Sequence, residues 1–176
     1  MSFAPSAKIR KRLIAAAVLM IIITAAAVLI THMSSEYLVL YNSDTGSMHI
    51  SRKAEDGLTF SVEFVHSVNQ TPVKDTYIIE DGQIKALSTV YRSFGAGVQT
   101  ALGEGQTMTY DEEGNMVITG YDITYDPLRY IVGTVSDHIL EIDGEKISLR
   151  NMCGRNARVV FKVVTRFEIL TKGLLQ

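Results

Sequence analysis

The chain has 176 residues, of which 47% are hydrophobic and 20% are charged. This length fits one domain with an appendage, since domains usually hold about 100–200 residues. The formal net charge of −2 and the lack of a basic stripe argue against nucleic acid as a partner.

The N-terminal segment combines a basic start with a long apolar run. Residues 13–30 are apolar except for Thr24 and contain neither a charge nor a proline. As a helix this run would extend roughly 27 Å, close to the thickness of a bilayer's hydrocarbon core. Four basic residues precede it, and the first acidic residue is Glu36. Because cationic flanks stay on the cytoplasmic side, we predict a single-pass anchor with the N-terminus inside and the remaining chain outside.

A cleaved signal peptide is the alternative for the same segment. Residues 25–27 are three alanines at cleavage-like spacing, but residues 28–30 continue the apolar run beyond them. The apolar part of a signal peptide usually spans about 7–15 residues. We therefore favour an uncleaved signal-anchor, with a cytoplasmic basic segment (1–12), a transmembrane anchor (13–33) and an extracytoplasmic domain (34–176).

The predicted extracytoplasmic part is acidic and has a single thiol. Four of the 17 basic residues precede the anchor, so this part carries 13 positive and 19 negative charges, a net charge of −6. Cys153 is the single cysteine, so no intramolecular disulfide can form. The domain must therefore be held together by its hydrophobic core, which a segment of this size can bury.

Beyond Ser34 the hydrophobic period changes from helical to two. Phe60, Val62, Phe64 and His66 occupy alternate positions, a pattern typical of a half-buried strand. Asp-Gly pairs at 81–82 and 143–144 separate β-prone runs and predict two tight hairpins. Other β-prone runs are residues 37–41, 116–119 and 158–170. We expect about nine or ten short strands and no helix after the anchor, which predicts an all-β antiparallel sandwich or small barrel.

His66 is the first candidate for a functional residue. Its position places it on the apolar face of its strand, either as a satisfied core residue or as part of an apolar pocket, where it could change its protonation state. Ser67 points to the opposite face of a regular strand, so the two residues do not form a base and nucleophile. A hydrolase would need another serine brought in by the fold, and no G-x-S-x-G elbow supplies one.

A glycine-rich stretch, residues 91–105, is the second candidate and reads as a loop. Gly95 and Gly97 would let a backbone approach a ligand, and Arg92 could pair with a carboxylate or phosphate. A turn shaped only by backbone needs is the alternative, since Gly95-x-Gly97 followed by Thr100 does not fit the dinucleotide fingerprint. The four histidines lack ligand-like spacing, so we predict neither a metal nor a cofactor.

Two sequence elements, in this order, carry a family resemblance. Phe64-Val65-His66-Ser67-Val68 is followed by Thr71-Pro72-Val73 and Asp75, and later by Ser93-Phe94-Gly95-Ala96-Gly97. Over roughly residues 58–164 the chain resembles a family of bacterial exported proteins known as domain of unknown function 1850. Asp75 stands where we expect a glutamate in many relatives. The resemblance implies a β-rich domain outside the bacterial cytoplasmic membrane, in the periplasm, with one ligand or partner site made of His66, Ser67, Pro72, Asp75, Arg92, Gly95 and Gly97.

The resemblance also implies a role. Members of this family are often encoded beside TAXI-type TRAP transporters, which take up organic acids with an extracytoplasmic binding protein. We therefore expect a non-enzymatic, membrane-anchored accessory protein that contacts a TRAP-type permease or its binding protein. The alternative is a module that binds or senses a small carboxylate, with Arg92 or Arg155 as the anion partner. A hydrolase that uses His66 is the remote alternative.

Overall fold

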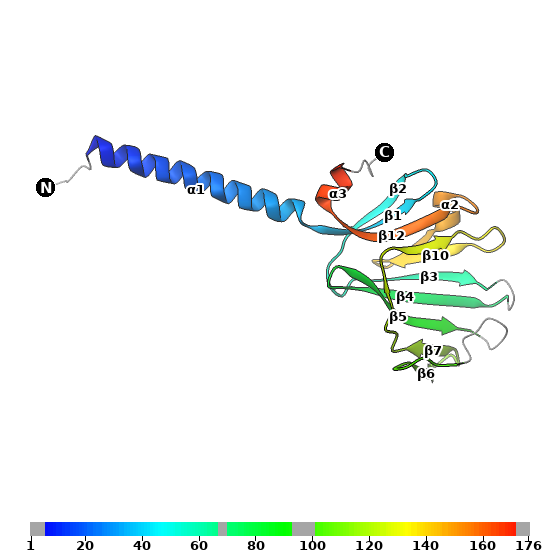
Figure 1. Cartoon of the computed structure of the whole chain (residues 1–176). Helices are drawn as coiled ribbons and strands as arrows, with labels where there is room; N and C mark the ends of the chain where they lie inside the picture. Colours follow the sequence, from blue (N-terminus) through cyan, green and yellow to red (C-terminus); the bar gives the residue numbers. More distant parts are fainter. Residues whose placement is uncertain (1–5, 67–69, 93–100, 172–176) are drawn as a thin grey trace.

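The computed structural model describes residues 6–66, 70–92 and 101–171 of the chain. One long N-terminal helix, α1 (Ala7–Met33), leads into a β-rich domain at its C-terminal end (Figure 1). In the described part the strands are β1 (Glu36–Asn42), β2 (Met48–Lys53), β3 (Thr59–Val65), β4 (Pro72–Glu80), β5 (Gln83–Tyr91), β6 (Thr107–Tyr110), β7 (Met116–Thr119), β8 (Thr124–Tyr125), β9 (Leu128–Ile131), β10 (His138–Ile142), β11 (Glu145–Ser148) and β12 (Arg158–Thr165).

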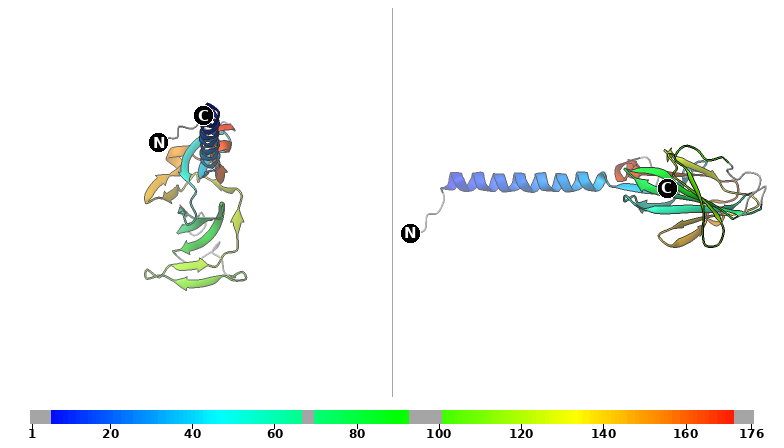
Figure 2. Two further views of the ribbon diagram at one scale, coloured as in Figure 1. Left: turned by 90° about the vertical axis from the view of Figure 1, so that its left-hand side faces the viewer. Right: turned by 90° about the horizontal axis from the view of Figure 1, so that it is seen from below.

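The N-terminal apolar helix that the sequence predicts is confirmed. α1 is long and apolar enough to cross a membrane, and none of its residues is buried against the domain. Only Ser34 and Ser35 separate it from β1. Figure 2 shows that the helix leaves the domain at one end and extends away from it. The domain is therefore tied closely to the C-terminal end of α1.

The strands form two antiparallel sheets. The smaller sheet has the order β2-β1-β12-β9, and the larger one has the order β11-β10-β3-β4-β5-β7-β6 with β8 paired to β5. One hydrophobic core draws buried side chains from both sheets, and Phe60 of β3 stacks on Phe161 of β12 with ring centroids 5.2 Å apart. The predicted all-β antiparallel fold is confirmed, and its form is a sandwich.

The two Asp-Gly turns lie where the sequence predicts them. Asp81 and Gly82 join β4 to β5, and Asp143 and Gly144 join β10 to β11. All four residues have positive φ, between 52° and 76°. This backbone conformation suits the right-handed twist of a tight hairpin, and glycine adopts it without steric cost.

The prediction of no helix after the anchor is wrong. Two short helices follow it, α2 (Leu149–Cys153) and α3 (Arg166–Thr171), and side chains cap the start of each. Ser148 Oγ accepts the N–H of Asn151 at 3.0 Å and begins α2. Thr165 and Glu168 form a reciprocal capping box: Thr165 N–H donates to Glu168 Oε2 at 3.0 Å, and Glu168 N–H donates to Thr165 Oγ1 at 3.2 Å. The long strand predicted over residues 158–170 therefore ends at Thr165.

Candidate functional site

The register of the larger sheet places a carboxyl on its inner face. Asp75 on β4 pairs with Val62 on β3 and with Thr89 on β5, and Thr89 pairs with Ile118 on β7. Residues directly opposite each other in an antiparallel sheet point to the same side. Val62 and Ile118 are fully buried, so Asp75 lies between apolar neighbours on the core side.

Two hydroxyl groups, one from each sheet, satisfy the Asp75 carboxyl. Thr89 Oγ1 donates to one carboxyl oxygen at 2.8 Å, and Tyr130 OH donates to the other at 3.1 Å. Tyr130 belongs to β9 of the smaller sheet, so this bond joins the two layers. The Tyr130 hydroxyl also shares a hydrogen bond with the hydroxyl of Tyr77, which therefore acts as the donor in that pair.

Burial dominates the electrostatics of this network. It raises the pKa of the Asp75 carboxyl above the ordinary value, although the bonds from Thr89 and Tyr130 act in the opposite direction. Burial also raises the pKa of Tyr77 and Tyr130, and the nearby Asp75 carboxylate adds to both increases. The two tyrosines consequently keep their protons at neutral pH and remain donors.

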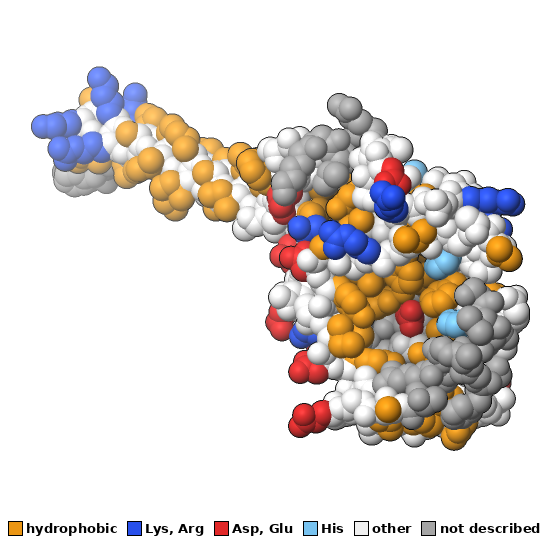
Figure 3. All heavy atoms as spheres, turned by 45° about the vertical axis from the view of Figure 1, so that its right-hand side comes forward, with side chains coloured by type: hydrophobic (Ala, Val, Ile, Leu, Met, Phe, Trp, Pro, Cys, Tyr) orange, Lys and Arg blue, Asp and Glu red, His pale blue; other side chains and the backbone are white. Residues whose placement is uncertain are grey.

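The inner face of the larger sheet is only partly covered. The smaller sheet has fewer strands, and Met116 and Ile118 of β7 form a separate small cluster with Tyr91, Met108 and Tyr121. Figure 3 shows a recess in which hydrophobic side chains gather, with an acidic side chain among them. The register places Asp75 and Thr89 between the shared core at Val62 and this separate cluster at Ile118.

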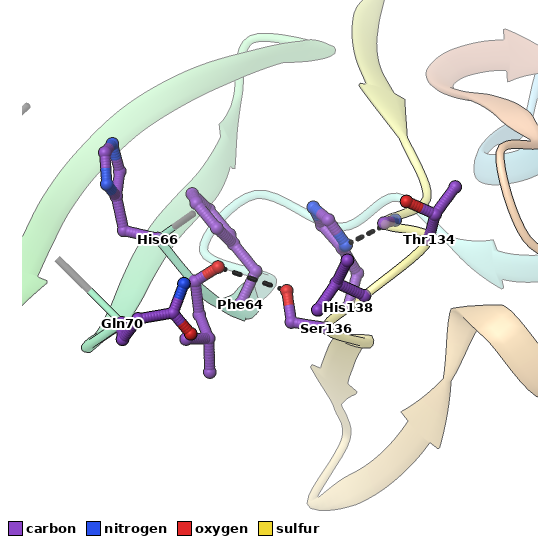
Figure 4. Close-up of a pocket in the computed structure, with 9 residues that line it drawn as sticks. Phe64, His66, Gln70, Thr134, Ser136 and His138 are labelled. Atoms are coloured by element: carbon purple, nitrogen blue, oxygen red, sulfur yellow. Dashed lines mark hydrogen bonds between the residues drawn. The ribbon is translucent and has the colours of Figure 1, made fainter. Parts of the chain in front are cut away.

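A pocket of about 440 Å³ lies beside this network, where β3 ends. Phe64, Val65, His66 and Gln70 form one wall, and the loop over residues 133–138 forms the other. Figure 4 shows Phe64 between His66 and His138, with Gln70 and Ser136 nearby. The volume lies within the range of about 300–1,000 Å³ that is usual for small-molecule sites.

His138 connects the pocket to the Asp75 network. Its ring stacks on Phe64 with centroids 5.0 Å apart and meets the Tyr130 ring edge-on at 5.8 Å. Its Nδ1 accepts the N–H of Gly133 at 3.1 Å, which assigns the remaining ring proton to Nε2 in the neutral form. Burial lowers the pKa of His138 and so favours this neutral form.

The loop over residues 133–138 is held by specific contacts. A Cβ at Gly133 would lie 2.3 Å from the carbonyl oxygen of Ser136, so only glycine fits there without a backbone shift. Arg150 Nη2 donates to the carbonyl of Gly133 at 3.1 Å. Asp137 accepts the N–H groups of His138 at 2.7 Å and Arg150 at 3.0 Å. These contacts fix the wall of the pocket that carries Ser136 and His138.

Ser136, the serine that lines the pocket, is not paired with a base. Ser136 Oγ donates to the carbonyl of Val65 at 3.1 Å, whereas His138 Nδ1 is occupied by Gly133. Burial raises the pKa of the Cys153 thiol to about 11, so this thiol is protonated at neutral pH. Within the described residues, no group of three or more His, Cys, Asp or Glu side chains is placed to hold a metal ion.

The structure brings some of the sequence-predicted site residues together. His66 lines the pocket, and Pro72, which begins β4, pairs with Val65 at the same end of the sheet. Asp75 lies further along β4 and connects to the pocket through Tyr130. Ser67, Gly95 and Gly97 lie outside the described residues.

Arg92 is separated from the pocket. Its guanidinium is 3.9 Å from Glu63, and the Arg92 side chain is more than half exposed. Glu63 alternates along β3 with the inward-facing Val62 and Phe64, so Arg92 and Glu63 lie on the outer face of the sheet. Arg155 is exposed as well.

Sequence reasoning missed the partners from residues 128–138. Tyr130 is two residues from the buried Leu128 and from the buried Val132, and His138 is two residues from the buried Leu140, so each shares a strand face with buried neighbours. A polar or aromatic residue in phase with buried neighbours is the signal that could have identified both. The same signal identifies His66, because apolar residues occupy alternate positions more regularly in its strand than in residues 128–138.

A match to a protein family spans the strands that form this site. Residues 60–149 match the family described as domain of unknown function (DUF1850). The chain belongs to this family. Comparison with curated proteins and with solved structures gives no match. The DUF1850 match runs from β3 to the start of α2 and includes His66, Asp75, Tyr130 and His138, whereas β1, β2 and β12 lie outside it.

The raised pKa of Asp75 predicts a pH dependence of stability. The folded chain holds a proton on Asp75 at pH values where the unfolded chain has released it. The free energy of unfolding should therefore fall as the pH rises from about 4 through the raised pKa. Asp75→Asn cannot ionise, so the wild type should lose stability relative to this variant over that window.

Urea titrations of the full chain in detergent over a pH series measure this difference. Asp122→Asn, which changes an exposed carboxyl, is the matched control. Its free energy of unfolding should change with pH as that of the wild type does. Parallel curves for Asp75→Asn and the wild type would show that the buried carboxyl does not govern stability.

Proposed function

We propose that this DUF1850 chain is a non-enzymatic binding domain, anchored in the bacterial cytoplasmic membrane, that serves as an accessory of a TRAP-type organic-acid transporter. The transporter partner is what the resemblance to this family implies, and the observation that supports an outward-facing binding domain is the placement of the pocket. β3 ends on the side of the domain away from α1, so a membrane-anchored domain would present this pocket to the extracytoplasmic space (Figure 1).

The junction between helix and domain supports a fixed presentation. Ser34 N–H donates to the carbonyl of Ile30 at 2.9 Å, which keeps the end of α1 helical up to the start of β1. β1 is a central strand of its sheet and contributes Leu38, Val39 and Leu40 to the buried core. A short junction to a core strand would hold the domain close to a membrane-embedded permease, within reach of a soluble binding protein.

The chemistry of the pocket supports binding over catalysis. It combines the aromatic surface of Phe64 and His138 with polar groups of His66, Gln70 and Ser136. Apolar walls with a few polar groups are the usual composition of a recognition site. The Ser136 hydroxyl donates to the backbone and His138 Nδ1 accepts from Gly133, so these two groups do not form a nucleophile and base.

Binding of a small carboxylate is the second candidate function, and the pocket volume favours it. About 440 Å³ accommodates a small organic acid, with the side chains of His66 and Gln70 at the wall. Asp75 is unsuited to contact an anion, because its carboxylate would repel it. A carboxylate would therefore bind at the His66 side of the pocket.

Co-purification tests the accessory role. The full-length protein, extracted from its native membrane in mild detergent, should bring along a TRAP-type permease or its binding protein. His66→Ala should reduce this recovery about tenfold if His66 contributes as an interface hot spot does. His49→Ala, a histidine change on β2 away from the pocket, is the matched control and should leave the recovery unchanged. Equal recovery with both variants would remove His66 from the contact, and recovery of no transporter component would contradict the accessory role.

A thermal-shift screen with small organic acids tests the second candidate. An acid present at about one hundred times its dissociation constant should stabilise the folded chain by about 2.7 kcal/mol. The amide of the same acid is the control for charge, and Gln70→Ala should abolish the shift that the acid produces. A screen in which no acid shifts the melting temperature would rule against carboxylate binding.

A further inference from the structure

The short C-terminal helix α3 lies at the end of α1. Arg166 N–H, in the first turn of α3, donates to the carbonyl of Ser35 at 2.8 Å, and the two helices are in contact. Arg166 Nη1 also donates to the hydroxyl of Tyr37 at 3.3 Å. Both Figure 1 and Figure 2 show α3 at the junction where α1 meets the domain.

The apolar side chains of α3 divide between two directions. Ile169 is 6% exposed and packs against Val39 and Val164 of the smaller sheet. Phe167 and Leu170 are 58% and 50% exposed and take no part in that cluster. One apolar side chain of α3 thus packs into the domain, while two large apolar side chains remain in contact with solvent.

If α1 spans the membrane, the start of α3 lies at the level of the lipid headgroups, measured along the membrane normal. The apolar run of α1 ends at Ile30, so Ser35 lies roughly 7–8 Å beyond the hydrocarbon core at about 1.5 Å per residue. The headgroup layer on each side of a bilayer is roughly 5–8 Å thick. Apolar side chains of an interfacial helix enter the boundary between headgroups and acyl chains by about 5–10 Å. Phe167 and Leu170 are therefore within reach of the membrane surface next to α1.

We propose that α3 is an interfacial helix whose Phe167 and Leu170 insert into the outer leaflet beside α1. This inference rests on the membrane position of α1 that the proposed function includes. The exposed apolar side chains and the continuity with the membrane-spanning helix both favour lipid as the occupant of this surface. Two contacts with the bilayer, α1 and α3, restrict the tilt of the domain and keep the pocket end directed away from the membrane.

The sequence contains no tryptophan, which makes single-tryptophan variants a direct test. Phe167→Trp is placed in the full-length chain and reconstituted in two sets of phosphatidylcholine vesicles, whose acyl chains are brominated near the headgroup in one set and near the terminal methyl group in the other. Two reference variants are prepared in the same way: Ile22→Trp within α1, and Val135→Trp, which replaces a side chain that is 88% exposed on the pocket loop.

We expect the emission of Phe167→Trp to be shifted to the blue and quenched by the shallow bromines at least about half as much as that of Ile22→Trp is quenched by the deep bromines. Val135→Trp should show the emission of a solvent-exposed tryptophan without quenching. Leu170→Trp provides a second probe of the same face and should behave as Phe167→Trp does.

Two results would overturn the inference, and they are distinguishable. If Ile22→Trp is quenched while Phe167→Trp and Leu170→Trp resemble Val135→Trp, α1 is in the bilayer and α3 is not in contact with lipid. If Ile22→Trp is also unquenched, the membrane anchor fails, and the proposed function fails with it.

Discussion

The hydrogen bond from Tyr130 to Asp75 joins the two sheets beside the pocket. A carboxyl on an apolar face needs donors, and Thr89 supplies one from the same sheet while Tyr130 supplies the other from the facing sheet. This bond positions β9 over β4. The chain after β9 continues into the loop whose contacts place His138 against Phe64. The pocket wall therefore depends on a polar contact between the layers, in addition to the hydrophobic core.

The arrangement also relates the pocket to the membrane. Two residues join α1 to a core strand, and the pocket lies at the far end of the sandwich. In the proposed account α1 and α3 hold the near end at the bilayer, and the strands act as a rigid spacer that carries the pocket outward. The residues that match DUF1850 contain the pocket and the Asp75 network, whereas β1 and β12, which connect the domain to α1 and α3, lie outside the match. The binding end and the anchoring end thus belong to different parts of the sequence.

Local patterns in the sequence predict much of the fold but little of the site. The apolar run of α1, the alternation around Phe60 and the two Asp-Gly turns each depend on neighbouring residues, so the sequence reveals them directly. The bond between Asp75 and Tyr130 joins residues 55 positions apart and follows from the packing of the two sheets, which no local period encodes. The β-prone composition of residues 166–170 predicts a strand, whereas the capping box of Thr165 and Glu168 starts a helix there. His66 could be placed on a face by period two, but its neighbours across the pocket come from the distant β9–β10 loop.

Cysteine labelling shows on which side of the membrane the pocket lies. Cys153→Ser removes the single native thiol, after which Val135→Cys reports on the pocket loop and Ser6→Cys reports on the start of α1. Spheroplasts are treated with a maleimide that does not cross membranes. The account predicts that Val135→Cys is labelled in intact spheroplasts and that Ser6→Cys is labelled only after lysis. Labelling of Ser6→Cys in intact spheroplasts, with Val135→Cys protected until lysis, would contradict it.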